Sequence, residues 1–188
     1  FSSSCERGVY RSADGGESWE QVLFLTDSTA AIDLVQHPTN PDILYTAMWE
    51  RIRGLNYRKS GGETSGIWKT VDGGDNWVEL INGLPSGDNI GRIGLDISIS
   101  NPDILYAFYD QHINEDEDYS FRGIFKTTDG GESWVQTNDN SIMDMSSRFG
   151  WYFGQIRIDP GNPDRVYALG VDLVRTENGG NSWEAIAG

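Results

Sequence analysis

Apolar and polar residues alternate with a period of two along most of this 188-residue chain. The alternating runs are short, as in Arg92 to Ile97 and Gln155 to Ile158, and they are separated by Gly, Pro, Asn and Asp. Such alternation between turn residues is typical of β-strands, whose side chains point in turn to the two faces of a sheet. The pattern predicts an all-β protein built from many short strands.

One eight-residue phrase recurs between these runs: Ser or Thr, any residue, Asp or Asn, two glycines, two further residues and Trp. Glycine adopts a positive φ without a Cβ clash, and an Asp or Asn side chain accepts hydrogen bonds from N–H groups a few residues ahead. Each copy therefore predicts a tight turn between two antiparallel strands. We call these copies the Gly-Gly corners, and they occupy residues 12–19, 70–77, 127–134 and 176–183.

A second phrase, Asn-Pro-Asp, begins at residues 40, 101 and 162, which gives a spacing of 61 residues both times. Proline fixes φ and cannot continue a ladder of hydrogen bonds, so this phrase also predicts a turn. Strand-like runs flank it on both sides. One repeat is therefore expected to hold four antiparallel strands, A to D, with Asn-Pro-Asp between A and B and a Gly-Gly corner between C and D.

Four-stranded units of this length are typical of the blades of a β-propeller, which pack around a common axis. Strands C and D of one blade are expected at 8–24, and three whole blades at 31–82, 91–138 and 154–187. About three and a half blades are fewer than the four to eight of a closed propeller. We interpret residues 1–188 as a partial β-propeller, an incomplete array whose remaining blades belong to a longer parent chain.

The charge of the chain limits its partners. It carries 29 acidic and 14 basic residues, a net charge of −15, which opposes nucleic acid phosphates. No apolar stretch is long enough to span a membrane, so no membrane insertion is expected. Cys5 is the lone cysteine, and His37 and His112 do not stand at metal-ligand spacing, so no cofactor is predicted.

The Gly-Gly corner resembles the Asp-box, or bacterial neuraminidase repeat, of sialidases, xyloglucanases and the sortilin luminal domain. With the Asn-Pro-Asp phrase and the run Leu44 to Arg51, the chain looks most like the sortilin-type propellers of large secreted bacterial proteins. The resemblance implies a secreted or cell-surface location. In the Asp-box the acid serves the turn and the Trp packs between strands, so these residues are expected to be structural: Asp14, Trp19, Asp72, Trp77, Asp129, Trp134, Asn178 and Trp183.

Topology predicts where a ligand would bind. In an antiparallel blade the two motif turns share one end, and the longer B to C and D to A loops share the other. Loops held by a rigid scaffold are where binding residues concentrate. Aromatic rings beside arginines suit a glycan or a polypeptide, although these loops could instead simply pack on one another. The candidate contacts are Trp49, Arg51, Arg53, Tyr57, Arg148, Trp151 and Tyr152.

A glycoside hydrolase requires two carboxyl groups about 5 to 10 Å apart across the scissile bond. Alignment of the repeats places Glu50 and Asp110 near the ends of neighbouring B strands, one position apart. They are the weak catalytic candidates, because either could instead pair with Arg51 or Arg122. The Arg-Ile-Pro start of sialidases is absent, since Gly94 follows Arg92 and Ile93.

An acidic run offers calcium ligands at Glu115, Asp116 and Asp118, but without the spaced pattern of a calcium loop it is better interpreted as a solvated acidic loop.

Two hypotheses of function follow. The first is a non-catalytic extracellular propeller that binds a polypeptide or glycan on its B to C and D to A loops. The second is a glycoside hydrolase, xyloglucanase-like or sialidase-like, whose active site lies on the same face or on the missing blades.

Overall fold

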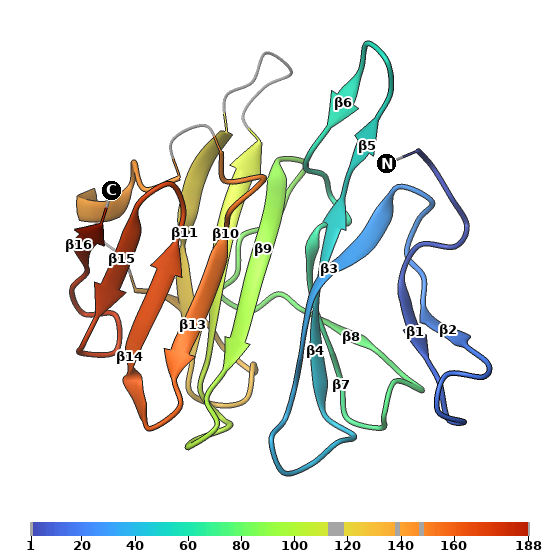
Figure 1. Cartoon of the computed structure of the whole chain (residues 1–188), viewed down its shortest axis with the longest axis horizontal. Helices are drawn as coiled ribbons and strands as arrows, with labels where there is room; N and C mark the ends of the chain where they lie inside the picture. The colour runs from blue at the N-terminus through green and yellow to red at the C-terminus, as the bar shows by residue number, and fades with distance from the viewer. Residues whose placement is uncertain (1, 113–118, 138–139, 147–148, 188) are drawn as a thin grey trace.

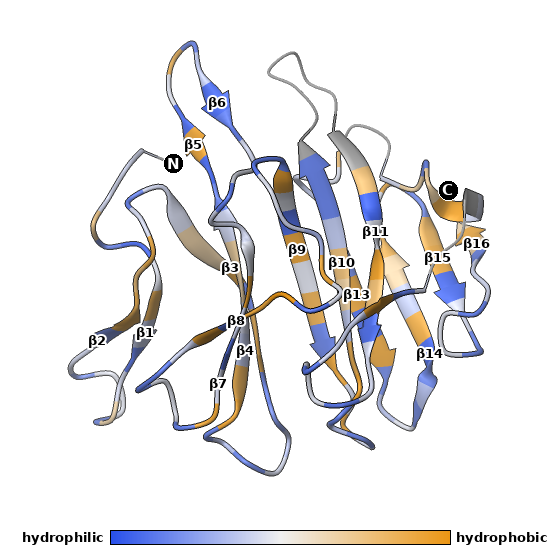
Figure 2. Ribbon diagram, turned by 180° about the vertical axis from the view of Figure 1, so that it is seen from behind, coloured by the Kyte–Doolittle hydropathy of each residue, from blue (hydrophilic) through white to orange (hydrophobic). Residues whose placement is uncertain are grey.

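The structure is a computed structural model that describes residues 2–112, 119–137, 140–146 and 149–187 (Figure 1). Over these residues the regular secondary structure is β-strand, apart from one 3-10 turn, η1 (Asn140–Ile142). The alternation of apolar and polar residues is therefore expressed as the strands that it predicts. Figure 2 shows apolar residues gathered on the strands and mainly hydrophilic residues in the turns at the lower end.

The strands form three four-stranded antiparallel sheets and two smaller ones. The N-terminal sheet pairs β1 (Val9–Arg11) with β2 (Glu20–Leu23). The next contains, in order, β3 (Thr29–Gln36), β4 (Leu44–Glu50), β7 (Gly66–Thr70) and β8 (Val78–Leu80). The third contains β9 (Ile90–Ile97), β10 (Leu105–His112), β11 (Tyr119–Thr127) and β12 (Val135–Gln136). The last contains β13 (Gln155–Asp159), β14 (Asn162–Leu169), β15 (Leu173–Thr176) and β16 (Glu184–Ala187).

Each large sheet follows chain order, and the first strand of each sheet contacts the first strand of the next: β3 contacts β9, and β9 contacts β13. The sheets stand side by side like the blades of a fan (Figure 1). This is the arrangement of successive β-propeller blades. The structure thus confirms the predicted incomplete array: three whole blades preceded by two strands of another.

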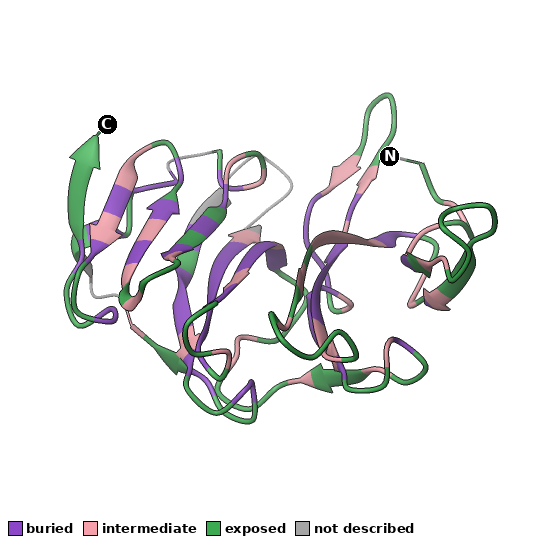
Figure 3. Ribbon diagram, turned by 60° about the horizontal axis from the view of Figure 1, so that its bottom comes forward, coloured by how far each residue is buried: buried purple, intermediate pink, exposed green. Residues whose placement is uncertain are grey.

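The hydrophobic core lies between the blades. Strand β10 faces two neighbours at once: Leu105, Ala107 and Tyr109 pack toward the sheet before it, and Tyr106 and Phe108 pack toward the sheet after it. All five side chains are fully buried. The middle blade is accordingly the most buried, whereas at the ends of the array β16 is exposed along its length and β2 over its first two residues (Figure 3).

The Gly-Gly corners share one hydrogen-bond pattern. In the second corner the Asp72 carboxylate accepts the Asn76 N–H at 2.9 Å, and the Thr70 hydroxyl accepts the Gly74 N–H at 3.0 Å. Gly73 and Gly74 have φ values of 72° and 101°, in the left-handed region that favours glycine. Hydrogen bonds from the side chain and backbone of Asn76 lower the pKa of Asp72 to about 2. The Asp72 carboxylate thus bonds the backbone of its own turn.

The second, third and fourth corners are also bound to the preceding blade. A basic residue at the end of the third strand donates to the carbonyl of the first glycine in the next corner. The three bonds run from Arg11 to Gly73 at 3.0 Å, from Lys69 to Gly130 at 2.8 Å and from Lys126 to Gly179 at 3.3 Å. We call them the forward bonds, because each joins one repeat to the following one.

Near the axis, carboxylates join the first strands of neighbouring blades. Asp33 in β3 accepts the N–H of Leu95 in β9 at 3.0 Å, and Asp96 in β9 accepts the N–H of Ile158 in β13 at 2.7 Å. These strands are at the edges of their sheets, where backbone N–H groups have no ladder partner. The two aspartates therefore satisfy donors that the sheets leave free.

Two expected details are wrong. The third Asn-Pro-Asp phrase is not a turn: β14 begins at Asn162, and the turn falls at Pro160 and Gly161, where Gly161 N–H bonds the Asp159 carboxylate at 2.8 Å. Trp19 does not pack between strands but is 63% exposed, because its two-stranded sheet has no preceding sheet to cover it in the described structure. Its counterparts Trp134 and Trp183 are buried.

Candidate ligand-binding face

The motif turns lie together at one end of the blades, as the topology predicts. Within each whole blade the first glycine of the corner donates its N–H to the Asp carbonyl of the Asn-Pro-Asp phrase. These bonds join Gly73 to Asp42 (2.9 Å), Gly130 to Asp103 (3.0 Å) and Gly179 to Asp164 (2.9 Å). The B to C and D to A loops emerge at the opposite end, which is the upper end in Figure 1. We call this end the loop face.

An open aromatic cavity of about 500 Å³ lies on the loop 149–154, just before β13. Phe149 and Tyr152 are 50% and 62% exposed, and Tyr152 packs edge-on against Trp151 and Phe153. The cavity thus offers rigid ring surfaces to solvent. Its lining residues are Phe149, Trp151, Tyr152, Phe153 and Val171.

Arg51 brings two of the predicted aromatic residues together. Its guanidinium lies 4.5 Å from the centre of the Trp49 ring and 5.0 Å from that of Trp151. Trp49 lies near the end of β4 (Leu44–Glu50) in one blade, whereas Trp151 precedes β13 two blades further on. Since Arg51 is 8% exposed and Trp49 5%, this stack is loop-to-loop packing, and the indole N–H of Trp49 is bonded to the Ser60 carbonyl at 2.9 Å.

Two further predicted contacts lie on a small hairpin that sequence reasoning did not foresee. Strands β5 (Ile52–Arg53) and β6 (Arg58–Lys59) pair within the first insertion, and Gly54 N–H bonds the Tyr57 carbonyl at 2.7 Å. Tyr57 is 53% exposed. The turn residues Gly54 and Asn56 were the available signal. Arg148, Glu115, Asp116 and Asp118 lie outside the described residues, so their predicted roles stay predictions.

Glu50, one of the two catalytic candidates, is held in an ion pair. Its carboxylate accepts the Lys59 ammonium at 2.5 Å and the Thr64 hydroxyl at 3.0 Å. Burial opposes ionisation, but the bonds from Lys59 and Thr64 prevail and lower the pKa of Glu50 below its ordinary value. The group is therefore a bound carboxylate that joins β4 to its hairpin.

Asp110, the other candidate, has the opposite environment. Its side chain is fully buried, and among the described residues neither carboxylate oxygen has a hydrogen-bond partner. Burial raises the pKa of Asp110 to about 8, and the Gln111 N–H and the charge of Arg92 offset this only in part. An ion-paired carboxylate and a buried acid do not form an open catalytic pair. Their proposed role in hydrolysis stays a prediction.

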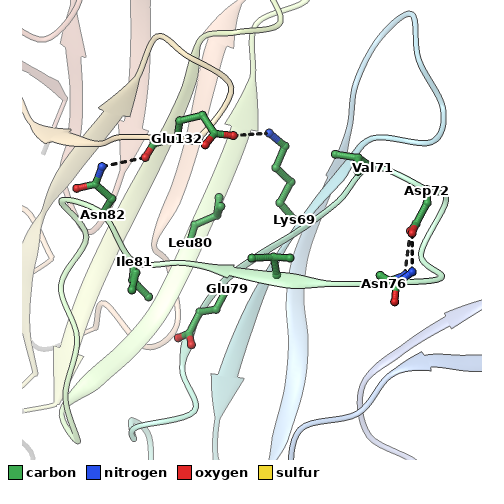
Figure 4. A pocket seen from close by; sticks show the side chains of 11 residues that line it. Lys69, Val71, Asp72, Asn76, Glu79, Leu80, Ile81, Asn82 and Glu132 are labelled. Carbon is green, nitrogen blue, oxygen red and sulfur yellow. Dashed lines mark hydrogen bonds and ion pairs between the residues drawn. The ribbon is translucent and has the colours of Figure 1, made fainter.

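A second cavity of about 350 Å³ lies away from the loop face, between β8 and the next Gly-Gly corner (Figure 4). Its polar groups are bonded to one another: Lys69 lies 3.6 Å from the Glu132 carboxylate, and the Asn82 amide donates to the Glu132 carbonyl at 3.0 Å. Leu80 and Ile81 line it on the apolar side. No local sequence signal predicts this cavity, because its lining comes from two neighbouring blades.

Within the described residues no cluster of three or more His, Cys, Asp or Glu side chains is placed to hold a metal ion. In the same part of the chain, no helix has the length and apolar character required to cross a bilayer.

Comparison with known proteins identifies the fold. No family model matches the chain. The sequence is 23% identical over 203 residues to Xyloglucanase Xgh74A of Acetivibrio thermocellus, a match that covers 90% of this chain and 22% of that protein. The chain therefore spans about a fifth of the length of the curated relatives that it matches.

Solved structures agree on the architecture. The GH74 xyloglucanase of Xanthomonas campestris superposes with a TM-score of 0.63 at 18% identity, over 96% of this chain and 26% of that one. YCF48 bound to a D1 peptide superposes with a TM-score of 0.54 at 17% identity, over 85% of this chain and 40% of that one. The protein is thus an all-β chain with the fold of part of a β-propeller, similar to segments of these proteins.

Proposed function

We propose that this chain is part of a non-catalytic, extracellular propeller that binds a glycan on its loop face, with the aromatic cavity at residues 149–153 as the principal contact. The observation that carries the proposal is the exposure of Phe149 and Tyr152 beside an apolar hollow. Aromatic rings held edge to face present flat apolar surfaces, which suit the apolar face of a sugar ring. An extended β-glucan such as xyloglucan is the favoured ligand, because the similar curated proteins are named xyloglucanases.

The carboxyl groups support binding rather than hydrolysis. Hydrolysis of a glycosidic bond requires two carboxyl groups placed on either side of it. In this chain Glu50 is bound to Lys59, and Asp110 is enclosed without access to solvent. A polypeptide ligand and a hydrolase with its active site on further blades are the alternatives that the experiment must separate.

The proposal is tested by calorimetric titration of the protein with xyloglucan oligosaccharides. Loss of one stacking ring is worth roughly 0.5 to 1.5 kcal/mol, so Tyr152→Ala and Phe149→Ala should each weaken binding by about two- to tenfold. Trp19→Ala is the matched control, because Trp19 is equally exposed but lies in a motif turn at the other end of the blades.

Equal losses in Trp19→Ala and Tyr152→Ala, or no binding at all, would contradict the proposal. Binding of unstructured peptides in place of oligosaccharides would reassign the face to polypeptides. Release of reducing sugar that is abolished by Glu50→Gln would establish the hydrolase instead.

A further inference from the structure

The backbone at Asp110 is irregular. The pairing of β10 with β11 shifts between Tyr109 and Asp110, and the pairing of β10 with β9 shifts between Tyr109 and Gln111. Irregularities of this kind redirect a side chain and are common beside functional sites. The strand therefore departs from regular pairing on both sides at the residue whose carboxyl group is buried.

The loop that carries the aromatic cavity rests on this carboxyl group. A Cβ atom at Gly150 would lie 2.1 Å from Oδ1 and 2.4 Å from Cγ of Asp110, which no real contact permits. Glycine is thus required for the loop to approach so closely. Gly150 lies between Phe149 and Trp151, so the contact between the loop and Asp110 is one residue away from two of the rings that line the cavity. We call this contact of Gly150 with the Asp110 carboxyl group the loop seat.

The surroundings of Asp110 do little to stabilise a negative charge: the nearby Gln111 N–H and the charge of Arg92 lower its pKa, but burial outweighs both and raises it. From β9, Arg92 is the charged group whose field reaches it, but the Arg92 Nη1 donates to the Tyr152 carbonyl at 3.1 Å, and its buried Nε has no partner. From β11, the residue opposite Asp110 is the apolar Phe121. From the loop, Gly150 presents backbone alone.

An ionised carboxylate without hydrogen bonds is costly to bury, whereas its protonated form is tolerated. After the proton is lost, the carboxylate would be stabilised by contact with water, but the Gly150 backbone covers it. Ionisation therefore favours displacement of the loop.

We propose that Asp110 is a positioning residue: as an uncharged carboxylic acid it seats the loop 149–154, and loss of its proton releases the loop and disassembles the aromatic cavity. This contact between Asp110 and the loop does not depend on whether a ligand binds. Its consequence for affinity rests on the proposed function, because a glycan that stacks on Tyr152 would bind more weakly in mildly alkaline solution.

The test is hydrogen–deuterium exchange of the amides of residues 149–154 between pH 6 and pH 9, with exchange times scaled to the intrinsic rate at each pH. Asp110→Asn, which keeps the shape and cannot ionise, is the reference. The wild-type loop should match the variant at pH 6 and exchange faster at pH 9, by roughly tenfold at one pH unit above the midpoint. Gly150→Ala should exchange fast at every pH, whereas Gly54→Ala, whose added methyl meets only an ordinary contact at 3.7 Å, should not.

A wild-type loop that stays as protected as Asp110→Asn at pH 9 would overturn the proposal. Should Asp110→Asn fail to fold, the carbon-13 shift of the wild-type Asp110 carboxyl decides the matter, because a group already ionised at pH 5 cannot act in this way. If the loop is released at high pH as expected but no glycan binds, the proposed function is rejected, whereas the proposed role of Asp110 in holding the loop still stands.

Discussion

At the scale of single residues, the Gly-Gly corners show why Asp and Asn are interchangeable in one position. The Asn178 side chain accepts the Ser182 N–H at 3.0 Å, as Asp129 accepts the Ser133 N–H at 2.9 Å, and its amide donates to the Ser182 hydroxyl at 2.9 Å. The geometry is kept while the charge is lost. The fourth corner is therefore a natural control for what the charge contributes.

The charge makes the corners sensitive to acid. Hydrogen bonds, first from the Ser133 or Asn76 side chain, lower the pKa of Asp129 and Asp72 to about 2. A lowered folded-state pKa stabilises the fold above the unfolded value near 3.8, and this contribution is lost as the pH falls toward 2. The double variant Asp72→Asn/Asp129→Asn should thus lose less thermal stability than wild type between pH 5 and pH 2.

Melting temperatures measured across that range check this expectation. Asp88→Asn, at an exposed acid outside the corners, should follow wild type. An unchanged acid sensitivity in the double variant would show that the corner carboxylates do not govern it.

At the scale of elements, neighbouring blades are joined through shared acceptors. The Gly130 carbonyl receives both the Lys69 ammonium at 2.8 Å and the buried Tyr45 hydroxyl at 2.9 Å, which come from β7 and β4 of the preceding blade. One peptide group therefore fixes the angle between two sheets. Either donor alone still satisfies the carbonyl.

This shared acceptor predicts non-additive variants. Tyr45→Phe and Lys69→Met should each lower the free energy of unfolding by about 1 kcal/mol, a typical net value for one hydrogen bond. The double variant should lose more than the sum, because the carbonyl is then buried without a donor. Urea denaturation of all four proteins measures the coupling, with Tyr10→Phe as a control at a half-exposed tyrosine. Strict additivity would mean that the two bonds are independent.

The strands and turns were predictable because their signals are local. Gly73 and Gly74 with Asp72 specify a corner within a few residues, and alternation specifies a strand. The aromatic cavity and the contact that holds its loop on Asp110 were not predictable, because they depend on residues far apart in sequence. Arg51 contacts Trp151, and Gly150 covers Asp110. Sequence reasoning identified Asp110 and Trp151 as candidates from their place on the loop face, but it could not foresee that one is enclosed and the other stacked.

At the scale of the whole molecule, the chain carries a net charge of −15. Self-repulsion of this kind destabilises a compact state and is screened by salt over a distance of about 10 Å at 0.1 M ionic strength. The melting temperature at pH 7 should rise between 10 mM and 200 mM sodium chloride. Differential scanning calorimetry measures it, and a fall over the same range would indicate that attractive ion pairs such as Arg11 with Asp75 outweigh the repulsion.

The forward bonds have a consequence for how such a chain can change in length. Donor and acceptor lie 62 residues apart for Arg11 and Gly73, 61 for Lys69 and Gly130, and 53 for Lys126 and Gly179, about one repeat in each case. Duplication or loss of one complete repeat would leave every remaining forward bond with a cation as donor and a glycine carbonyl as acceptor. A cut that removes part of a repeat would separate a cation from its carbonyl. Growth by whole copies is thus the step that evolution, or an engineer, can take without redesigning an interface.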